Sequence, residues 1–434
     1  MKVAVITPYW REDKKTLKKC IDSVSSQTYK ATHIIVADGN PQTIDNKKII
    51  HIKLPFNIGN SGATPRGLGA KIAFDMGFDA VAFLDADNWF DKNHIASCVK
   101  LQKKENLDVV FARRNIIFPD GEVLKIEDPQ DKEGKHVDTN CFFISKRASF
   151  LVNVWLMWPK EFGTGEDRIL LSAIRKYELK TQHLMEPTVW YQTNWANHYS
   201  LANKTPTVPL RNPLKRAAWN FEPLRFEQMT GLKTHWPKAN KAIPPRLSIE
   251  DDQSIWVVAI NPSKQKILNI KETLKEFKKG ELLVINCNNS YEEVDGRLAK
   301  TLTLPYYQNF ETKVFSIGSA IAFQSGAEAV CLIKSNSIDL NYKNIKKSIF
   351  HLIQSKLDII VEKIVPIEAT QGSKEELKNP NEKSFNSILL PVTSANLGIV
   401  ISNLKEPNHN FIRNLKLAIA NKIKIGVLKV INAP

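Results

Sequence analysis

The chain contains 434 residues and carries a formal net charge of +16, with 43% hydrophobic and 24% charged residues. Its length exceeds the usual size of one hydrophobic core, so we expect two or three domains. The composition is that of a soluble globular protein that needs no disulfide or metal to stabilise its core. Five widely spaced cysteines without a Cys-x-x-Cys pair predict neither a zinc site nor a disulfide framework, and they favour a reducing compartment.

The excess of basic residues predicts attraction to an anionic partner such as nucleic acid, a membrane surface or a phosphorylated substrate. A basic surface that only keeps the protein soluble is an equally good interpretation. Zinc-finger spacing, RNP-type strings and basic heptad helices are absent from the sequence, so we expect no specific nucleic-acid partner. No apolar stretch approaches the ~20 residues that span a bilayer, and the start lacks a signal-peptide pattern. We therefore predict a cytoplasmic protein with at most peripheral contact at the inner face of the membrane.

The first elements of the chain predict a parallel sheet. Apolar runs at Lys2–Ile6, His33–Ala37 and Ile49–Leu54 are typical of buried strands, and Thr16–Ser26 has helical spacing. Strand, helix and strand in this order form the βαβ unit of a parallel sheet.

A carboxylate pair follows the next strand. After the glycine-rich loop Asn57–Gly62 and a helix that ends near Met76, the apolar run Ala80–Leu84 ends in Asp85 and Asp87. Open α/β sheets place their ligand crevices at such strand ends. Two carboxylates offer hard oxygen ligands to Mg²⁺ or Mn²⁺, and such a cation neutralises a diphosphate. A solvated turn is the alternative interpretation of an Asp-x-Asp string.

The remaining elements of the first half are predicted as follows: a helix at His94–Gln102, a strand at Val109–Ala112, an extended segment at Val137–Ile144 and a helix at Arg168–Tyr177. A proline-rich stretch at 204–252 has few periodic runs, so we interpret it as a packed extension followed by a linker. Its segment Arg211–Phe226 mixes basic and aromatic residues, which predicts either contact with a membrane surface or packing on the first domain. The predicted domains are therefore 1–203 and 253–434.

The second half repeats the first faintly. Three ordered matches support this: Ile255–Pro262 with Lys2–Pro8, Leu282–Asn288 with Ile34–Asn40, and Gly318–Val330 with Gly69–Val81. In this alignment the acidic and polar positions of the first half are replaced: Thr7 by Asn261, Asp38 by Asn286, Asp85 by Lys334 and Asp87 by Asn336. We interpret 253–434 as a degenerate, non-catalytic copy; coincidental βαβ similarity is the alternative.

These motifs together make the first half, over roughly 200 residues, resemble a family 2 glycosyltransferase with the GT-A fold. Five ordered motifs carry the resemblance: Ile6–Tyr9, Ala37–Gly39, Asn57–Arg66, Asp85–Asp87 and Gly165–Asp167. The fold that it implies is α/β, with a Rossmann-like, mostly parallel sheet flanked by helices. With the repeat, we expect two tandem domains of this kind.

The resemblance implies a nucleotide-sugar site. Thr7, Pro8 and Tyr9 would hold the base and ribose, Asp38 would accept the base NH, and Arg66 would pair with the diphosphate. An Asp-Gly turn and an ordinary surface arginine are the structural alternatives for the last two.

The resemblance also implies a cation, Mn²⁺ or Mg²⁺. Asp87 would bind it directly, and Asp85 would contact the ribose or reach the metal through water. His198 is the candidate third ligand and His183 is its rival, although a lone histidine also has ordinary structural roles.

Asp167, beside Glu166, is the predicted general base that takes the proton of the acceptor hydroxyl. A capping box that begins at Thr164 is the structural alternative. Asp138, Asn140 and Trp158 are weaker candidates for the acceptor side of the site.

The sequence thus predicts a metal-dependent inverting glycosyltransferase that moves a sugar from a nucleotide diphosphate, with UDP favoured, to a glycan or lipid-linked acceptor of a surface polysaccharide. A homo-oligomer is compatible with this, since the second half would serve as a dimer interface, an acceptor platform or a completion of the fold. A non-catalytic binding or scaffold protein is one alternative. A sugar-nucleotide pyrophosphorylase is the other, but its glycine-rich loop is missing after the first strand.

Overall fold

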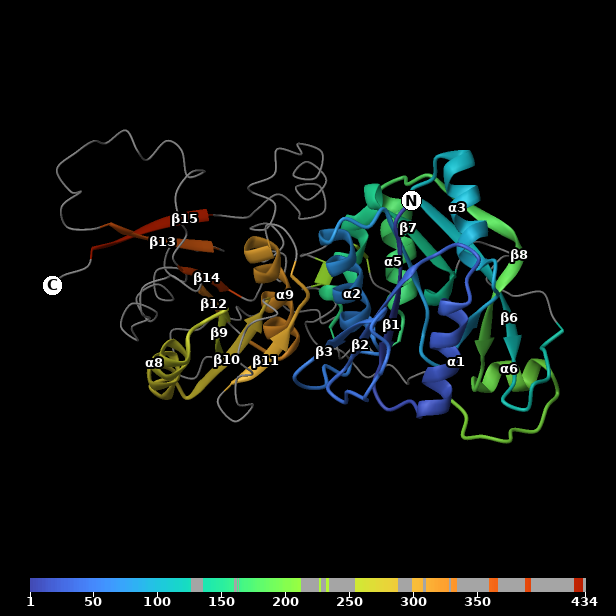
Figure 1. Ribbon diagram of the computed structural model, residues 1–434, viewed down its shortest axis with the longest axis horizontal. Helices are drawn as coiled ribbons and strands as arrows, with labels where there is room; N and C mark the ends of the chain where they lie inside the picture. Colours follow the sequence, from blue (N-terminus) through green and yellow to red (C-terminus); the bar gives the residue numbers. More distant parts are fainter. Residues whose placement is uncertain are drawn as a thin grey trace. The chain divides into compact units, whose positions relative to one another are not determined.

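The computed structural model describes residues 1–125, 136–159, 162, 164–211, 226–227, 232–233, 254–287, 299–306, 310–327, 329–333, 359–365, 387–391 and 425–431. The chain forms two compact units, Met1–Asn220 with Leu232–Pro237, and Phe221–Gly231 with Lys238–Pro434. Each unit contains its own sheet, and each is described by itself (Figure 1).

Four parallel strands form one half of the first sheet, in the spatial order β3 (Ile50–Lys53), β2 (Thr32–Ala37), β1 (Val3–Tyr9), β4 (Ala80–Phe83). All seven residues of β1 and all four of β4 are buried, as expected for parallel strands covered on both faces. The α/β sheet predicted for the first half is confirmed.

The other half of the sheet is mixed. The strand β7 (Phe142–Ser145) lies antiparallel between β4 and β6 (Val109–Ile117), and β8 (Thr181–Gln192) then pairs with β6 in parallel and with the short β5 (Trp89–Phe90) antiparallel. The sequence did not predict β8. Its run contains Pro187 opposite a register shift at Arg113, and few of its residues are buried, so the alternation of a typical strand is absent.

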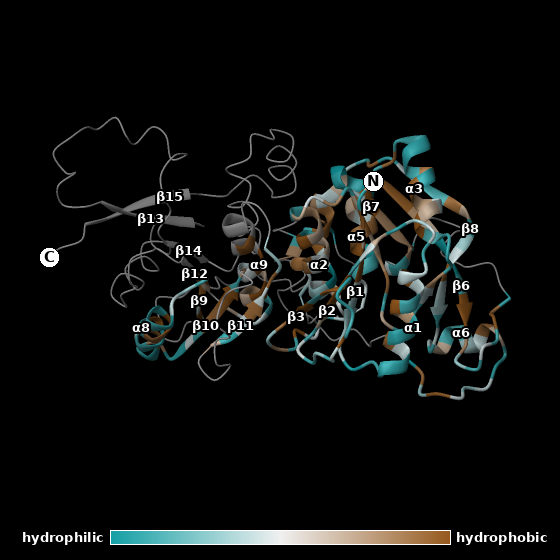
Figure 2. Ribbon diagram, in the orientation of Figure 1, coloured by the Kyte–Doolittle hydropathy of each residue, from teal (hydrophilic) through white to brown (hydrophobic). Residues whose placement is uncertain are grey.

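Helices cover both faces of this sheet. On one face, Thr7 of β1 contacts Cys20 of α1 (Lys14–Ser25), and α3 (His94–Glu105) lies on β6 and β8. On the opposite face, α2 (Ala63–Asp75) packs on β1, β2 and β4, and the layer continues with η2 (Lys146–Val152), α4 (Asn153–Leu156) and α5 (Glu166–Lys176). Figure 2 shows α3 as largely hydrophilic and β7 as hydrophobic.

The first unit extends beyond the predicted boundary at residue 203. After α6 (Ala196–Leu201), Val208 and Leu210 pack on a buried cluster that includes Phe118 and Tyr199. Arg211 exchanges backbone hydrogen bonds with the segment 194–196. This part of the proline-rich stretch therefore packs on the first unit, whereas 212–225, which holds most of the predicted basic and aromatic segment, lies outside the described residues.

The second unit contains a seven-stranded sheet and two described helices. Its elements are β9 (Ser254–Ile260), α8 (Lys264–Lys275), β10 (Lys279–Asn286), β11 (Lys300–Thr303), α9 (Phe310–Gln324), β12 (Ala329–Ile333), β13 (Ile359–Val365), β14 (Ser387–Pro391) and β15 (Ile425–Ile431). The spatial order is β11-β10-β9-β12-β14-β13-β15. Order and direction repeat those of β3-β2-β1-β4-β7-β6-β8.

Two glycines make equivalent close contacts in the two units. A Cβ atom at Gly69 of α2 would lie 2.7 Å from Ile6 and 3.0 Å from Val36, so only glycine allows α2 to approach β1 and β2 this closely. A Cβ atom at Gly318 of α9 would meet Val258 of β9 and, at 3.1 Å, Ile285 of β10.

The strand register changes two of the predicted correspondences. Val3 lies opposite Ala80 in the first sheet, and Ile255 lies opposite Ala329 in the second. Aligning the two units on these pairs places Asn261 at Tyr9 rather than at Thr7. The same alignment of β2 with β10 places Cys287, rather than Asn286, at Asp38. Lys334 and Asn336 lie outside the described residues.

No helix in the described part of the chain is long and apolar enough to cross a membrane.

We expect Gly69→Ala and Gly318→Ala each to destabilise the protein, because the added methyl group overpacks the helix against the sheet at a cost of about 1–3 kcal/mol. Urea unfolding followed by tryptophan fluorescence measures the loss. Lys18→Ala, on the exposed face of α1, is the control and should shift the midpoint little. Unfolding midpoints that match this control would show that the close approach is dispensable.

Candidate active site

The site is built around Asp85, which follows β4. Its carboxylate accepts a hydrogen bond from Arg66 Nη2 at 2.7 Å and one from Asn140 Nδ2 at 3.0 Å. Its backbone N–H donates to Asn140 Oδ1 at 2.5 Å. Two contacts to the carboxylate and one to the backbone thus fix Asp85 at the end of the strand. Its side chain is 28% exposed.

Arg66 joins two chain segments that are far apart in sequence. It lies in the first turn of α2, only 2% exposed, and its Nη1 lies 3.8 Å from Glu166 Oε1 at the start of α5. Burial alone would lower the pKa of Arg66, but the charges of Asp85 and Glu166 raise it. Arg66 is therefore a buried counter-ion of two protein carboxylates and not an ordinary surface arginine, and its contact with a diphosphate stays a prediction.

Asp138 and Asn140 lie behind Asp85. Both side chains are buried, and Asn140 Nδ2 also donates to Asp138 Oδ1 at 2.6 Å. Arg114 of β6 pairs with Asp138 at 2.7 Å. The observed role of Asn140 is thus to hold Asp85, and that of Asp138 is to hold Asn140; contact of the two residues with an acceptor stays a prediction.

Asp87 is partly exposed, as Asp85 is. No other described residue forms a hydrogen bond or ion pair with its side chain, and burial followed by the charge of Asp85 raises the pKa of Asp87 to about 7. A divalent cation relieves both effects, because it compensates the charge that burial penalises. Carboxylate oxygens suit Mg²⁺ and Mn²⁺, which bind through one or two carboxylates with substrate phosphates and water. The residues present therefore fit the predicted cation.

The predicted third ligand is not part of such a set. Within the described ranges, no group of three His, Cys, Asp or Glu side chains is placed to hold a metal. His198 is buried on α6, with its Nδ1 2.6 Å from Thr193 Oγ1. His183, on β8, packs against Phe111 of β6. Both histidines have structural contacts, so a cation at Asp87 would need other ligands.

The acidic pair Glu166–Asp167 begins α5. The N-cap is Gly165, with a φ of 128° that favours glycine. Because a capping box needs a Ser or Thr side chain at the N-cap, the alternative of a capping box from Thr164 is wrong. Glu166 is buried, and burial followed by the charge of Asp167 raises the pKa of Glu166 to about 7. Its Oε2 accepts from Gly165 N at 2.8 Å. Glu166 faces Arg66 and the helix start, whereas the Asp167 side chain is 18% exposed.

One residue beside Asp167 was missed by the sequence analysis. His136 Nε2 makes a short hydrogen bond to Asp167 Oδ2. Its signal in the sequence was the alternation His136-x-Asp138-x-Asn140, because an extended chain points alternate side chains to one side.

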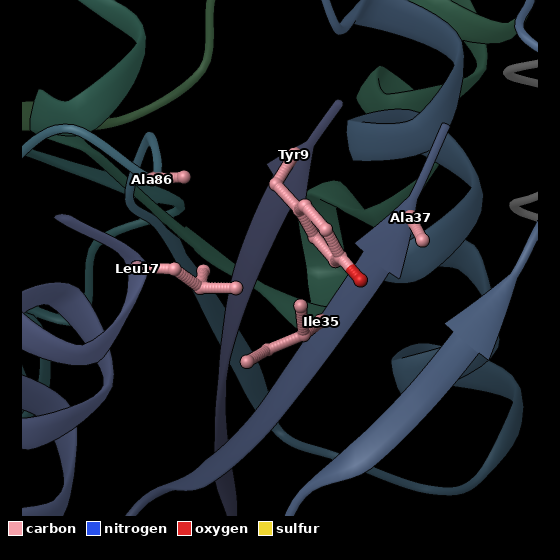
Figure 3. Packing of buried hydrophobic residues seen from close by; sticks show 5 residues of the cluster. All are labelled: Tyr9, Leu17, Ile35, Ala37 and Ala86. Atoms are coloured by element: carbon pink, nitrogen blue, oxygen red, sulfur yellow. The ribbon is translucent and has the colours of Figure 1, made fainter. Parts of the chain in front are cut away.

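The predicted nucleotide residues after β1 are largely internal. Thr7 is fully buried, and its Oγ1 lies 2.8 Å from His33 Nε2 on the α1 side of the sheet, so only its backbone is left for a ligand. Tyr9 packs with Leu17, Ile35, Ala37 and Ala86, as Figure 3 shows. The Tyr9 hydroxyl accepts from Gln42 N at 2.7 Å. Because the ring is 2% exposed, base stacking on Tyr9 is not supported.

Pro8 and Asp38 meet the glycine-rich loop. Pro8 is buried and lies beside Gly62 at the start of α2. Asp38 accepts hydrogen bonds from Ile58 N at 2.8 Å, Gly59 N at 3.2 Å and Asn57 Nδ2 at 2.9 Å. Burial raises the pKa of Asp38. The observed role of Asp38 is thus to hold this loop, and its contact with a base stays a prediction.

Trp158 belongs to the core. It is fully buried and packs edge-on against Phe162, with ring centroids 4.9 Å apart. The acceptor-side role predicted for its side chain is therefore not supported.

We expect Arg66→Met to destabilise the first unit by about 3–5 kcal/mol, because it leaves Asp85 and Glu166 without their buried counter-ion. Chemical denaturation measures this loss. The matched control is Arg147→Met, which removes an ion pair from a half-exposed arginine and should cost about 1 kcal/mol or less. The double variant Arg66→Met/Glu166→Gln should recover part of the loss, because one buried charge is removed; equal midpoints for the Arg66 and Arg147 variants would contradict the assignment.

The family comparison concerns the first unit. Residues 4–169 match a family model described as "Glycosyl transferase family 2". No curated protein matches the chain. Among solved structures, the chain is similar to S. aureus TarS 1–349 alone (16% identity, TM-score 0.35), in complex with UDP (15%, 0.36) and in complex with UDP-GlcNAc (14%, 0.37). These alignments cover 46% of this chain and 61% to 63% of the TarS fragment, which is less than two thirds of its length.

TM-scores this low establish no common fold, so the assignment rests on the family match. That match includes the strand ends that carry Asp38 and Asp85 and the helix start that carries Asp167. Residues 4–169 of the first unit are therefore similar to family 2 glycosyltransferases.

Proposed function

We propose that the first unit transfers a sugar, with inversion, from a nucleoside-diphosphate sugar to a hydroxyl acceptor, with the help of a divalent cation. The observation that supports this most directly is the meeting of Asp85 with Glu166–Asp167 through Arg66, inside the region that matches the family 2 model. This contact places a carboxylate pair at a strand end near a second acidic pair at a helix start, which is the arrangement that such a transfer needs.

Asp87 would hold the cation, with Asp85 as a further ligand directly or through water. When bound, the cation offsets the negative charge that develops on the departing diphosphate. The chain's own contribution is to fix Asp85 through Arg66 and Asn140, so that the strand end does not have to reorganise when a donor binds.

Asp167 would be the general base. Of the two acids at the start of α5 it is the more exposed, and its pKa is lowered, because the hydrogen bond and charge of His136 outweigh the effect of burial. It is therefore ionised near neutral pH and able to accept the proton of the attacking hydroxyl. Glu166, bonded to Gly165 N and near Arg66, would keep the start of α5 in place.

The donor that we favour is a UDP-sugar, and the acceptor class is a glycan or a lipid-linked oligosaccharide for a surface polysaccharide. The net charge of +16 is compatible with phosphorylated substrates or an anionic membrane surface. Hexosyl transfer, peripheral membrane contact and oligomerisation belong to the same proposal.

We further propose that the second unit is a degenerate duplicate of the first. Three observations support a common origin: seven strands in the same order and direction, the matched sequence around Gly69 and Gly318, and the equivalent packing of these glycines. Coincidental similarity of two α/β sheets explains the strand order alone but not the shared glycine contacts.

We expect a nucleotide sugar to raise the melting temperature of the wild type in the presence of Mn²⁺, and Asp87→Ala to abolish the Mn²⁺-dependent part of this shift. A thermal-shift panel of UDP-, GDP- and dTDP-sugars with and without Mn²⁺ measures it. Asp22→Ala, at an exposed acid of α1, should behave as the wild type. If no nucleotide sugar stabilises the protein, a binding or scaffold function is favoured instead.

The Mn²⁺ effect should be larger at pH 8 than at pH 6. The pKa of Asp87 is raised to about 7, so its carboxylate is mostly protonated at pH 6 and mostly ionised at pH 8. Only the ionised form binds the cation well, and the same panel repeated at the two pH values tests this. Equal Mn²⁺ effects would show that Asp87 is not the titrating ligand.

We expect Asp167→Asn to lower kcat for release of the nucleoside diphosphate by about 10²–10⁴-fold, with the KM for the donor little changed, because the amide cannot accept the proton. Glu166→Gln is the matched comparison and should lower kcat less. A larger loss in Glu166→Gln than in Asp167→Asn would exchange the roles of the two acids.

A further inference from the structure

His136 is bound to the proposed base, and beyond lowering the pKa of Asp167 it has no role in the function proposed above. Its Nε2–H donates to Asp167 Oδ2, and the two side chains are 29% and 18% exposed. The other Asp167 oxygen, Oδ1, accepts from Arg168 N at 2.6 Å. A carboxylate oxygen has two acceptor positions, so Oδ1 retains one for a further hydrogen bond.

The segment that carries His136 organises the whole site. Three alternate residues each reach a different partner: His136 contacts Asp167, Asp138 pairs with Arg114, and Asn140 holds Asp85. This stretch, which enters a short 3-10 helix at Thr139–Cys141, thus ties the start of α5 to the end of β4 and to Arg114 within β6. A histidine that only filled space would not need this alignment with the two acidic positions.

The charges around His136 favour its protonated form. Burial and Arg114 lower the pKa of His136, but its hydrogen bond to Asp167 and the charges of Asp167 and Asp138 outweigh them and raise it. Conversely, burial raises the pKa of Asp167, whereas the hydrogen bond and charge of His136 lower it. The charge of Arg168 lowers it as well, and Asp167 also interacts with the neighbouring Glu166. The pair therefore keeps a proton on His136 and leaves Asp167 ionised.

We propose that His136 is a positioning residue for Asp167: it fixes Oδ2, so that Oδ1 faces the acceptor hydroxyl, and it keeps the carboxylate ready to accept a proton. This inference rests on the proposed function. In the transfer step the acceptor O–H bond breaks and its proton moves to Asp167 Oδ1. The acceptor oxygen bonds to the anomeric carbon, and the bond from that carbon to the diphosphate oxygen breaks with its electron pair leaving on the nucleoside diphosphate. His136 retains its own proton throughout.

The pair itself can be tested without any ligand. With ¹⁵N-labelled histidine, the ring resonances of the nine histidines are followed against pH by NMR, and the His136 signal is identified by its absence in His136→Gln. We expect the pKa of His136 to be lower in Asp167→Asn than in the wild type, because the carboxylate charge is gone. An unchanged pKa would overturn the proposal.

The role in catalysis is tested by turnover of the nucleotide sugar that stabilises the protein, measured as release of the nucleoside diphosphate. His136→Ala should lower kcat about 10–100-fold with the KM for the donor unchanged, because the base loses its orientation. His136→Gln keeps an N–H donor but no charge, so it should recover part of kcat. In the pH profile of kcat for His136→Gln, the acid limb should move to higher pH, since the pKa of Asp167 is no longer lowered by a charged histidine.

The outcomes separate the two proposals. If His136 titrates with Asp167 but His136→Ala retains the wild-type kcat, the pair is only structural and the positioning role is wrong. If Asp167→Asn retains kcat, the base is misassigned and the positioning role falls with it. If the wild type releases no nucleoside diphosphate from any donor in the panel, the proposed function is overturned, and His136 has no base to position whatever the titration shows.

Discussion

The buried ion pair between Arg66 and Asp85 is the interaction on which the site depends. Arg66 comes from the first turn of α2, Asp85 from the end of β4, and Glu166, which Arg66 also approaches, from the start of α5. A guanidinium with 3% of its side chain exposed cannot be hydrated well, so the two carboxylates must stay near it. Helix, strand end and second helix are therefore held together by one charge.

The sequence predicts the motifs of this site better than the burial of their residues and the contacts between them. The apolar strand before Asp85 and the glycines before Glu166 were visible as patterns, and the fold of the first half followed from βαβ spacing. Burial was not visible, because Arg66, Asp138 and Asn140 have side chains that are ordinarily exposed. Their contacts join residues tens of positions apart, such as Arg114 with Asp138 and His136 with Asp167. Local pattern alone cannot reveal such pairs.

Burial was equally invisible for two aromatic residues, which the sequence analysis placed at ligands. The resemblance implied that Tyr9 holds the nucleotide, and Trp158 was a weaker candidate for the acceptor side. Both side chains are buried in the core: Tyr9 packs against α1, and Trp158 packs against Phe162. Large aromatic side chains bury much apolar area, so packing competes with ligand binding for every such residue. In contrast, the glycines at Gly69 and Gly318 had a purely geometric meaning that the repeated sequence already indicated.

The charge of the site differs in sign from the charge of the chain. Five acids meet three basic side chains there: Asp85, Asp87, Asp138, Glu166 and Asp167 with Arg66, Arg114 and His136. The whole chain has a formal net charge of +16. The long-range field therefore attracts anions, whereas the field at close range opposes them. In the proposed function, an anionic donor would therefore need a compensating cation to settle at this edge of the sheet, so charge would be selected before shape.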